Sequence, residues 1–195
     1  MGFNFIKQIT ESALDVESEF WSDFVINSAK KGNWNIIYLL SNSVSREVSI
    51  LVDSKDNHFV DWGTIGSVKL RPPIGAVLPF KLWVHTHPSN TAYWSITDRN
   101  TLEMAKGILE KALVLGENGL LSTTLQSTNS FTGDNDDSKS QWTEEEVIDW
   151  LEYNRDNLDN LDYDFMEEIC VPEFKDKWFG RKLFTDTFDS EGNGW

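Results

Sequence analysis

The stretch 82–98 constrains the fold more than any other part of the chain, because it passes from a strand pattern to a helix-start pattern. The apolar run Leu82-Trp83-Val84 is followed by His85 and His87, two of the three histidines in the chain. Side chains two residues apart on a strand point to the same side, so both imidazoles are expected on one face of a sheet. Pro88 is expected to end the strand, since it has no N–H to donate to a neighbouring strand.

A helix is expected to begin at Ser95, because a serine followed three residues later by an acid, here Asp98, is a helix-start signature. The sequence therefore offers two imidazoles at a strand end and one carboxylate in the first turn of the next helix. Two neutral imidazoles and a carboxylate form a three-ligand set for Zn²⁺ that leaves a fourth position for water. We predict a zinc site made of His85, His87 and Asp98. The spacing of His58 from this motif gives no reason to include it in the metal set.

The pattern His-x-His-Pro, six residues, Ser, two residues, Asp resembles the JAMM motif of the MPN+ (Mov34/JAB) zinc metallopeptidase family. Within that family, His85-Thr-His87-Pro88 followed by Thr91-Ala-Tyr is most similar to the AMSH-type deubiquitinases. The resemblance implies an MPN/JAMM-like mixed β-sheet flanked by helices, and hydrolysis of an isopeptide bond by a zinc-activated water. The family's serine, which matches Ser95, helps to stabilise the oxyanion of the tetrahedral intermediate.

The general base of that family is a glutamate at the start of its first core strand. Glu47 is the only glutamate between Glu19 and the motif, and it opens the strand-like segment Glu-Val-Ser-Ile-Leu-Val. The assignment depends on residues 34–44, which fit either a buried strand or a short helix, because short apolar runs cannot be assigned by periodicity alone. If 34–41 were the first strand, Asn35 would hold the base position, and Glu47 would lie roughly 20 Å along the sheet. We predict Glu47 as the base, with Asn35 as the alternative occupant of that position.

The remaining segments predict an α+β fold, with helices packed around a mixed sheet. Residues 5–31 carry apolar side chains at three- and four-residue spacing and are predicted to form an amphipathic helix. Residues 58–63 fit a further strand. The helix that carries Asp98 is expected to continue to about Lys111. Two apolar runs joined by Glu-Asn-Gly, over residues 112–126, predict a hairpin.

Charge divides the chain unevenly. Residues 131–195 hold 19 of the 32 acids and 6 of the 17 bases, a balance of −13, against −2 for the first 130 residues. We expect residues 1–130 to form the JAMM/MPN-like metallopeptidase domain and residues 131–195 to form an acidic, aromatic-rich helical C-terminal extension. Residues 127–142 fit a polar linker, and residues 143–156 fit a helix opened by a capping box. The remainder is expected to dock on the core or on a partner, because disordered segments are poor in aromatic residues.

The composition also restricts partners and location. The acidic extension and the lack of a basic stripe argue against nucleic acid, whereas a basic protein surface would fit. No segment approaches the length of a membrane span, and the N-terminus lacks the apolar core of a signal peptide. The single cysteine, Cys170, fits a reducing, cytoplasmic setting. It also excludes the two-cysteine zinc-binding insertion of the AMSH type, so linkage specificity is not implied.

The sequence thus predicts a zinc-dependent peptidase or isopeptidase that cleaves an amide bond in a protein substrate. The resemblance implies a conjugate of ubiquitin or of a ubiquitin-like modifier as the substrate class. The alternative is a non-catalytic, zinc-binding MPN-like interaction module. The third interpretation is a RadC-like protein, in which His-x-His-Pro-Ser also occurs. The absence of a basic face argues against it.

Overall fold

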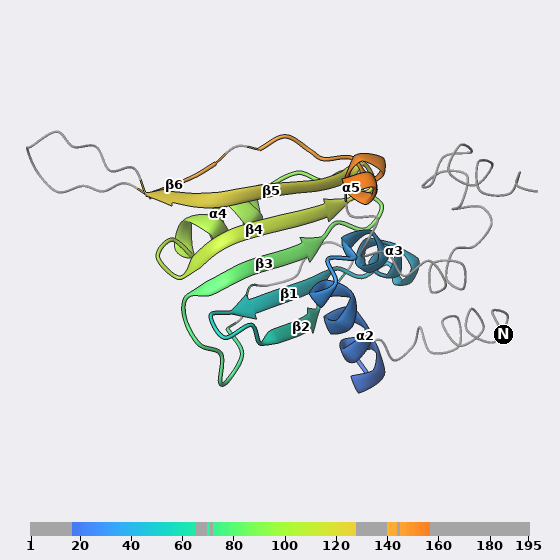
Figure 1. The fold of residues 1–195 in the computed structure, drawn as a ribbon, viewed down its shortest axis with the longest axis horizontal. Coiled ribbons are helices and arrows are strands. Elements are labelled where there is room, and N and C mark those ends of the chain that lie inside the picture. The colour runs from blue at the N-terminus through green and yellow to red at the C-terminus, as the bar shows by residue number, and fades with distance from the viewer. Residues whose placement is uncertain (1–16, 65–69, 71, 128–139, 144, 157–195) are drawn as a thin grey trace, which may run out of the picture. The chain divides into compact units, whose positions relative to one another are not determined.

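Groups of helices and groups of strands follow one another along the described part of the chain in a mixed α+β order. A computed structural model of the protein describes residues 17–64, 70, 72–127, 140–143 and 145–156. The expected α+β class is confirmed (Figure 1). The elements are α2 (Glu19–Lys30), α3 (Trp34–Val44), β1 (Val48–Asp53), β2 (His58–Trp62), β3 (Phe80–Thr86), α4 (Ile96–Met104), β4 (Leu109–Gly116), β5 (Gly119–Ser127), β6 (Ser140–Trp142) and α5 (Trp150–Asp156).

The six strands form one mixed sheet in the order β2-β1-β3-β4-β5-β6. All neighbouring strands run antiparallel except β3 and β4, which are parallel and pair from Phe80↔Leu109 to Thr86↔Leu115. Parallel neighbours need a crossover connection, and the segment that contains α4 supplies it. The strand that ends in the two histidines therefore lies at the centre of the sheet, between β1 and β4.

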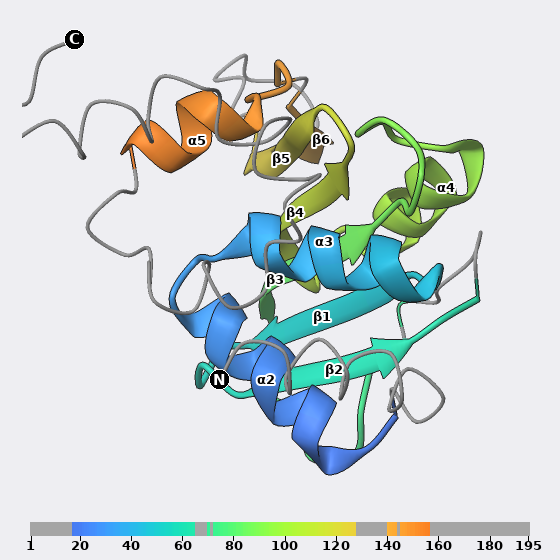
Figure 2. The same ribbon diagram turned by 90° about the vertical axis from the view of Figure 1, so that its right-hand side faces the viewer.

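Helices cover both faces of this sheet (Figures 1 and 2). On one face, α4 packs through Leu102 and Ala105 against Trp83, in a core cluster that also contains Leu51 and Ala112. The side chains that alternate with these, such as Ile50 and Val84, point to the other face, where α3 contacts β3 and β4. Because β3 is buried on both sides, its register is strongly fixed by the hydrophobic pattern.

The ambiguous segment 34–44 is a helix. α3 begins just after Gly32, which adopts φ 72°, and ends at Ser45 in the left-handed conformation. Residues 34–41 therefore do not form the first strand, and Asn35 lies in the first turn of a helix. The first strand is β1, and Glu47 directly precedes it.

The predicted first helix, hairpin and strand 58–63 are confirmed where the structure describes them. α2 covers Glu19–Lys30 of the predicted helix 5–31, and the part before residue 17 lies outside the described residues. β2 spans His58–Trp62. β4 and β5 are joined at the paired residues Gly116 and Gly119, as the Asn-Gly signal predicts.

The prediction that the second helix runs to about Lys111 is wrong. α4 ends at Met104, and Gly107 adopts φ 87°, a left-handed conformation that stops a helix. Ile108, the residue after Gly107, already bonds to the sheet, because its O accepts from Phe80 N of β3 at 2.7 Å. The residues from Leu109 onward gain more by pairing with β3 than by extending a helix.

The expected linker 127–142 and helix 143–156 are corrected in part. Residues 140–142 form β6, which pairs with β5, and residues 128–139 lie outside the described part. Thr143 does not cap a helix, because its Oγ1 accepts from Thr124 N at 2.9 Å and so continues the strand contact. The helix begins at Trp150, where Asp149 Oδ1 accepts from the N–H groups of Leu151 and Glu152 at 2.8 and 2.9 Å.

Val16–Ile148 form one compact unit that contains the whole sheet, and α5 belongs to a second. The expected docking tail and Cys170 lie outside the described residues. Among the helices that the structure describes, none is long and apolar enough to cross a membrane.

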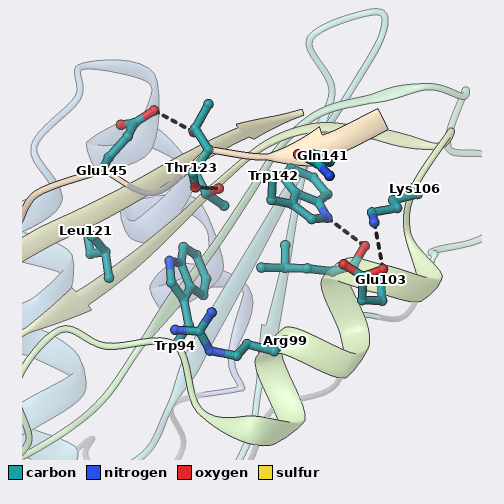
Figure 3. Close-up of a pocket in the computed structure, with 11 residues that line it drawn as sticks. Trp94, Arg99, Glu103, Lys106, Leu121, Thr123, Gln141, Trp142 and Glu145 are labelled. Carbon is teal, nitrogen blue, oxygen red and sulfur yellow. Dashed lines mark hydrogen bonds and ion pairs between the residues drawn. The ribbon is translucent and has the colours of Figure 1, made fainter. Parts of the chain in front are cut away.

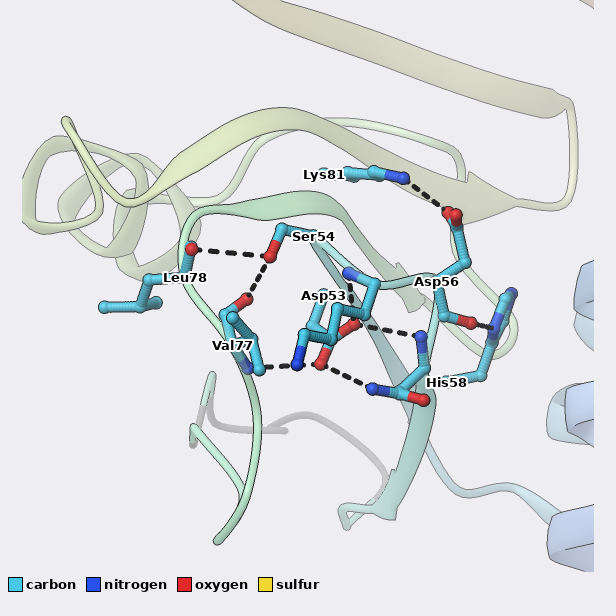
Figure 4. A network of polar contacts seen from close by, with 9 residues as sticks. Asp53, Ser54, Asp56, His58, Val77, Leu78 and Lys81 are labelled. Carbon is cyan, nitrogen blue, oxygen red and sulfur yellow. Dashed lines mark hydrogen bonds and ion pairs between the residues drawn. The ribbon is translucent and has the colours of Figure 1, made fainter.

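Asp53, the last residue of β1, fastens the following turn to the segment before β3 (Figure 4). Its side chain is fully buried and accepts four hydrogen bonds, from Lys55 N, Asn57 N, Asn57 Nδ2 and Val77 N, at 2.8 to 3.1 Å. Burial by itself would raise the pKa of this carboxyl. The side-chain bond from Asn57 and the three backbone bonds outweigh burial and lower the pKa from 3.8 to about 2.

We expect Asp53→Asn to lower the urea midpoint of unfolding at pH 7, because an amide cannot accept all four bonds. The folded-state pKa lies below the ordinary value, so the stabilisation by the carboxylate is present above pH 3.8 and is lost as the pH falls through about 2. The difference between the variant and the wild type should therefore shrink as unfolding is measured at successively lower pH. Asp56→Asn is the matched control. It removes only the exposed pair with Lys81, which is worth about 0–1 kcal/mol. A pH-independent effect of Asp53→Asn would contradict the assignment.

Candidate metal centre

His85, His87 and Asp98 come together as predicted. One ligand atom from each lies within 4.8 Å of the others, and all three residues are buried. His85 Nε2 lies 3.3 Å from Asp98 Oδ1, His87 Nε2 lies 3.5 Å from Asp98 Oδ2, and the two Nε2 atoms are 3.2 Å apart. This group could hold a metal ion.

The local fold accounts for the position of each ligand. β3 ends at Thr86, but His87 N still donates to Leu115 O at 2.8 Å, so the ring of His87 stays at the edge of the sheet. Asp98 is the third residue of α4. Ser95 Oγ accepts from Asp98 N at 3.1 Å and Asp98 Oδ2 accepts from Ser95 N at 2.8 Å, which forms a complete capping box. The predicted helix start is confirmed, and it also orients the carboxylate.

The electrostatics keep the cluster ready for a cation. Burial would raise the pKa of the Asp98 carboxyl, but hydrogen bonds with His85 and His87, the charge interaction with His85 and a side-chain hydrogen bond with Ser95 hold that pKa well below its usual range. Burial lowers the pKa of His85, and the neighbouring Asp98 opposes this only in part. A neutral imidazole and an ionised carboxylate are the protonation states in which these groups bind a metal.

Aromatic packing fixes the two imidazole rings. The ring of Trp83 stacks on His85 with centroids 4.6 Å apart and an interplanar angle of 18°, and Trp94 lies 5.8 Å from His85 on centroids. Tyr93 meets His87 edge-on at 4.8 Å. Trp83 is held in turn, because its Nε1 donates to Ser49 Oγ at 3.0 Å. Packing holds the Nε2 atoms towards Asp98, and the Nδ1 atoms find no partner within the described part of the chain.

The donor set fits a divalent cation better than it fits a set of hydrogen bonds. Two imidazole nitrogens 3.2 Å apart can share only one hydrogen, and both also face the same carboxylate. A cation between the three groups would satisfy both nitrogen lone pairs and the negative charge at once. Imidazole with carboxylate is a ligand combination typical of Zn²⁺.

Glu47 directly precedes β1, and the alternation of that strand assigns it to the face of the sheet that carries both histidines. β1 and β3 pair as Ser49↔His85, and continuing this antiparallel register by two residues places Glu47 opposite His87. Directly opposed residues have Cβ atoms about 4.5–5.5 Å apart. Glu47 is buried, with 6% of its surface exposed, and its own N–H donates to Thr64 O at 2.9 Å. Asn35, on α3, does not share this position.

A buried hydroxyl pair fixes the strand ends next to the ligands. Thr86 lies between His85 and His87 and points to the opposite face, where its Oγ1 accepts from Val48 N at 2.9 Å and contacts Ser41 Oγ at 2.5 Å. Ser41 Oγ also donates to Arg46 O at 2.7 Å. These bonds join α3 to β1 and β3. They hold the backbone on either side of Glu47, at Arg46 O and at Val48 N.

The loop between His87 and Asp98 rests on the β4–β5 turn. Ala92 N donates to Asn118 Oδ1 and Glu117 N donates to Asn90 O, both at 2.7 Å. A Cβ added to Gly116 would collide with the backbone of Thr91 and Ala92. Only glycine allows this approach, so the hairpin tip sets the position of the loop that connects the ligands.

Sequence reasoning missed several residues that shape the centre. Trp83 could have been found, because it lies two residues before His85 and so shares its face under the period-two rule that grouped the histidines. Gly116, Thr86 and Trp94 act through contacts with distant segments, and no local signal marks them. His58 lies outside the metal group, and its Nδ1 bonds Asp56 O at 2.8 Å in the turn before β2.

No family model, curated protein or solved structure matches the chain.

We expect Thr86→Val to destabilise the protein by about 1–3 kcal/mol, because the buried Val48 N–H and the Ser41 hydroxyl would lose a partner. Unfolding in urea measures this. Thr101→Val is the matched control, since Thr101 bonds only within the exposed surface of α4, and its effect should stay within about 0.5 kcal/mol. Equal effects of the two variants would show that the Thr86 hydroxyl has no special role.

We expect Gly116→Ala to weaken Zn²⁺ binding roughly tenfold or more, because the displaced loop would carry His87 and Asp98 out of register. Competition with a chromophoric chelator measures the affinity. Gly107→Ala is the control: its φ of 87° makes alanine cost about 1–2 kcal/mol of stability, but nothing lies within 4 Å of the added Cβ. Its metal affinity should match the wild type. Unaltered affinity in Gly116→Ala would rule out control of the loop by the hairpin.

Proposed function

We propose that the protein is a zinc-dependent hydrolase of an amide bond, of the JAMM/MPN+ kind. The observation that carries the proposal is the convergence of His85, His87 and Asp98 in the motif spacing. The register of β1 with β3, when it is continued by two residues, would bring Glu47 opposite His87 and so supports a base at that position. Two elements far apart in sequence thus supply a metal-ligand set and a carboxylate on one face of the sheet. A match to the motif alone would not require a carboxylate from a distant segment, such as that of Glu47, on this face.

The three ligands would leave one coordination position of Zn²⁺ open for water. When bound there, zinc would lower the pKa of a bound water and polarise a carbonyl oxygen. Zinc is favoured over Mg²⁺ or Ca²⁺, which prefer sets made only of oxygen ligands. The MPN-like identity of the fold is part of the same proposal, supported by the mixed sheet with helices on both faces.

Glu47 is proposed as the general base, which takes a proton from the attacking water and later gives it to the leaving amine. The continued register of β1 with β3 would bring its carboxylate beside the ligand cluster, where a well-placed base contributes about 10²–10⁴ in rate. Ser95 is proposed to stabilise the oxyanion. Its Oγ already accepts from Asp98 N, so its O–H hydrogen can be donated to a developing negative charge.

The substrate class is proposed from the resemblance to the AMSH type: an isopeptide between a protein and ubiquitin or a ubiquitin-like modifier. Exposed apolar side chains adjoin the ligands and could contact such a substrate. Tyr93, which packs on His87, is 47% exposed, and Ile96, at the start of α4, is 81% exposed. The proposal includes no nucleic-acid substrate and no membrane partner.

A non-catalytic zinc-binding interaction module is the second candidate. The burial of the ligands favours it, since His85, His87 and Asp98 are only 1%, 6% and 7% exposed, and closed structural metal sites are shielded from water. The two candidates share the metal and differ in whether Glu47 works on a water.

Glu47→Gln separates the candidates. We expect it to retain bound Zn²⁺, measured by mass spectrometry, and to lose about 10²–10⁴ in the rate of cleavage of a panel of isopeptide conjugates. His87→Ala should lose both the metal and the activity. Glu110→Gln, on an exposed position of β4, is the matched control and should behave as the wild type.

Three results would count against parts of this proposal. Folded wild-type protein without zinc would remove the whole site. Zinc with activity that survives Glu47→Gln would remove the base. Zinc without cleavage of any conjugate in the wild type would favour the interaction module.

A further inference from the structure

A recess lies beside α4 (Figure 3). It has a volume of about 560 Å³ and lies between α4 and the strands β5 and β6. Apolar groups line its inner part: Trp94, Leu102, Leu121 and Trp142. The other seven lining residues are polar or charged, and the volume lies in the range of small-ligand sites.

The recess shares parts with the metal centre. Trp94 lines it and also lies 5.8 Å from His85 on ring centroids. Leu121 is paired with Val114, which is paired with His85, so all three side chains point to one face. α4 begins with the turn that holds Asp98 and continues directly as a wall of the recess. A chain segment bound near the metal could therefore reach the recess.

The charges that line the recess are not equivalent. Lys106 is neutralised by Glu103, with Nζ 2.6 Å from the carboxylate, and Glu145 accepts from Thr143 Oγ1 at 3.1 Å. Arg99 is exposed, and its guanidinium forms no ion pair or hydrogen bond with any residue that the structure describes. Figure 3 shows Arg99 with Trp94 at one end of the recess and Glu103 with Lys106 at the other. One end therefore presents an unpaired cation next to an aromatic wall.

We propose that this recess binds an acidic side chain of a peptide, with Arg99 as the carboxylate ligand and Trp94 and Trp142 in contact with the aliphatic stem. A guanidinium binds a carboxylate through two parallel hydrogen bonds. A phosphate dianion fits less well, because one free cation would face two charges while Glu103 and Glu145 repel them. That the acidic residue lies near the scissile bond of the substrate rests on the proposed function.

The test is an NMR titration of the isotope-labelled full chain with two peptides, acetyl-Ala-Ala-Glu-Ala-Ala-amide and its counterpart with Gln in place of Glu. The indole N–H signals of Trp94 and Trp142 and the Nε–H of Arg99 report on the recess. We expect the Glu peptide to shift these signals and to bind roughly tenfold or more tightly than the Gln peptide, as one charge-assisted bond implies. We expect Arg99→Gln to abolish that preference and Arg99→Lys to retain part of it.

Lys106→Gln is the matched control, since it removes a cation of the same recess that is already paired. It should keep the preference for the Glu peptide. The proposal is overturned if neither peptide shifts the signals, if both bind equally, if Arg99→Gln binds as the wild type, or if Lys106→Gln loses as much as Arg99→Gln.

The metal centre is tested apart from the recess by repeating the titration on His87→Ala. The recess predicts an unchanged preference for the Glu peptide in that variant, because none of its lining residues is a metal ligand. In the wild type, absence of zinc and of cleavage with intact peptide binding would refute the proposed function and leave the recess. Cleavage by a protein that shows no preference for the Glu peptide would refute the recess and leave the proposed function.

Discussion

The carboxylate of Asp98 is the contact on which the centre of the molecule depends. One oxygen faces His85, and the other faces His87 and accepts from the backbone of Ser95. The same group thus starts a helix, draws two imidazoles of a central strand together and supplies the negative charge that a bound cation needs. α4 can occupy only one position along β3 if all these contacts are kept. After α4 the chain enters β4, which pairs with β3 in parallel, so the segment that carries Asp98 is the crossover between these two strands.

Much of this arrangement could be predicted from short-range rules. The period of two placed both histidines on one face, Pro88 marked the end of their strand, and Ser95 marked the helix start. The Asn-Gly pair gave the hairpin. Each of these rests on the conformational preference of a few neighbouring residues, which a sequence displays directly. These are also the features from which the candidate metal ligands were found.

Other elements were decided by contacts that a local pattern does not contain. The local pattern of residues 34–44 fits a strand or a helix equally well. The helix is held in place by a tertiary contact, between Ser41 on α3 and Thr86 on β3. Thr143 begins a sequence typical of a capping box, yet pairing with Thr124 on β5 takes its hydroxyl. The place of Glu47 opposite His87 comes from the register between two strands more than thirty residues apart in the chain. Tertiary pairing overrode propensity in the first two cases, and in the third it supplied what propensity could not.

The hairpin tip at Gly116 bears on how this protein could be altered. Tips of surface hairpins are ordinarily the places where a chain accepts inserted peptides, affinity tags or grafted epitopes, since little else depends on their path. Here the tip bonds to the segment that joins two ligands, through Asn118 to Ala92 and through Glu117 to Asn90. The turn after β1, held by Asp53, bonds instead to the start of β3 and the segment before it, at the end of that strand away from the histidines. A fusion partner or reporter would be better placed there, where a change of path leaves the metal ligands undisturbed.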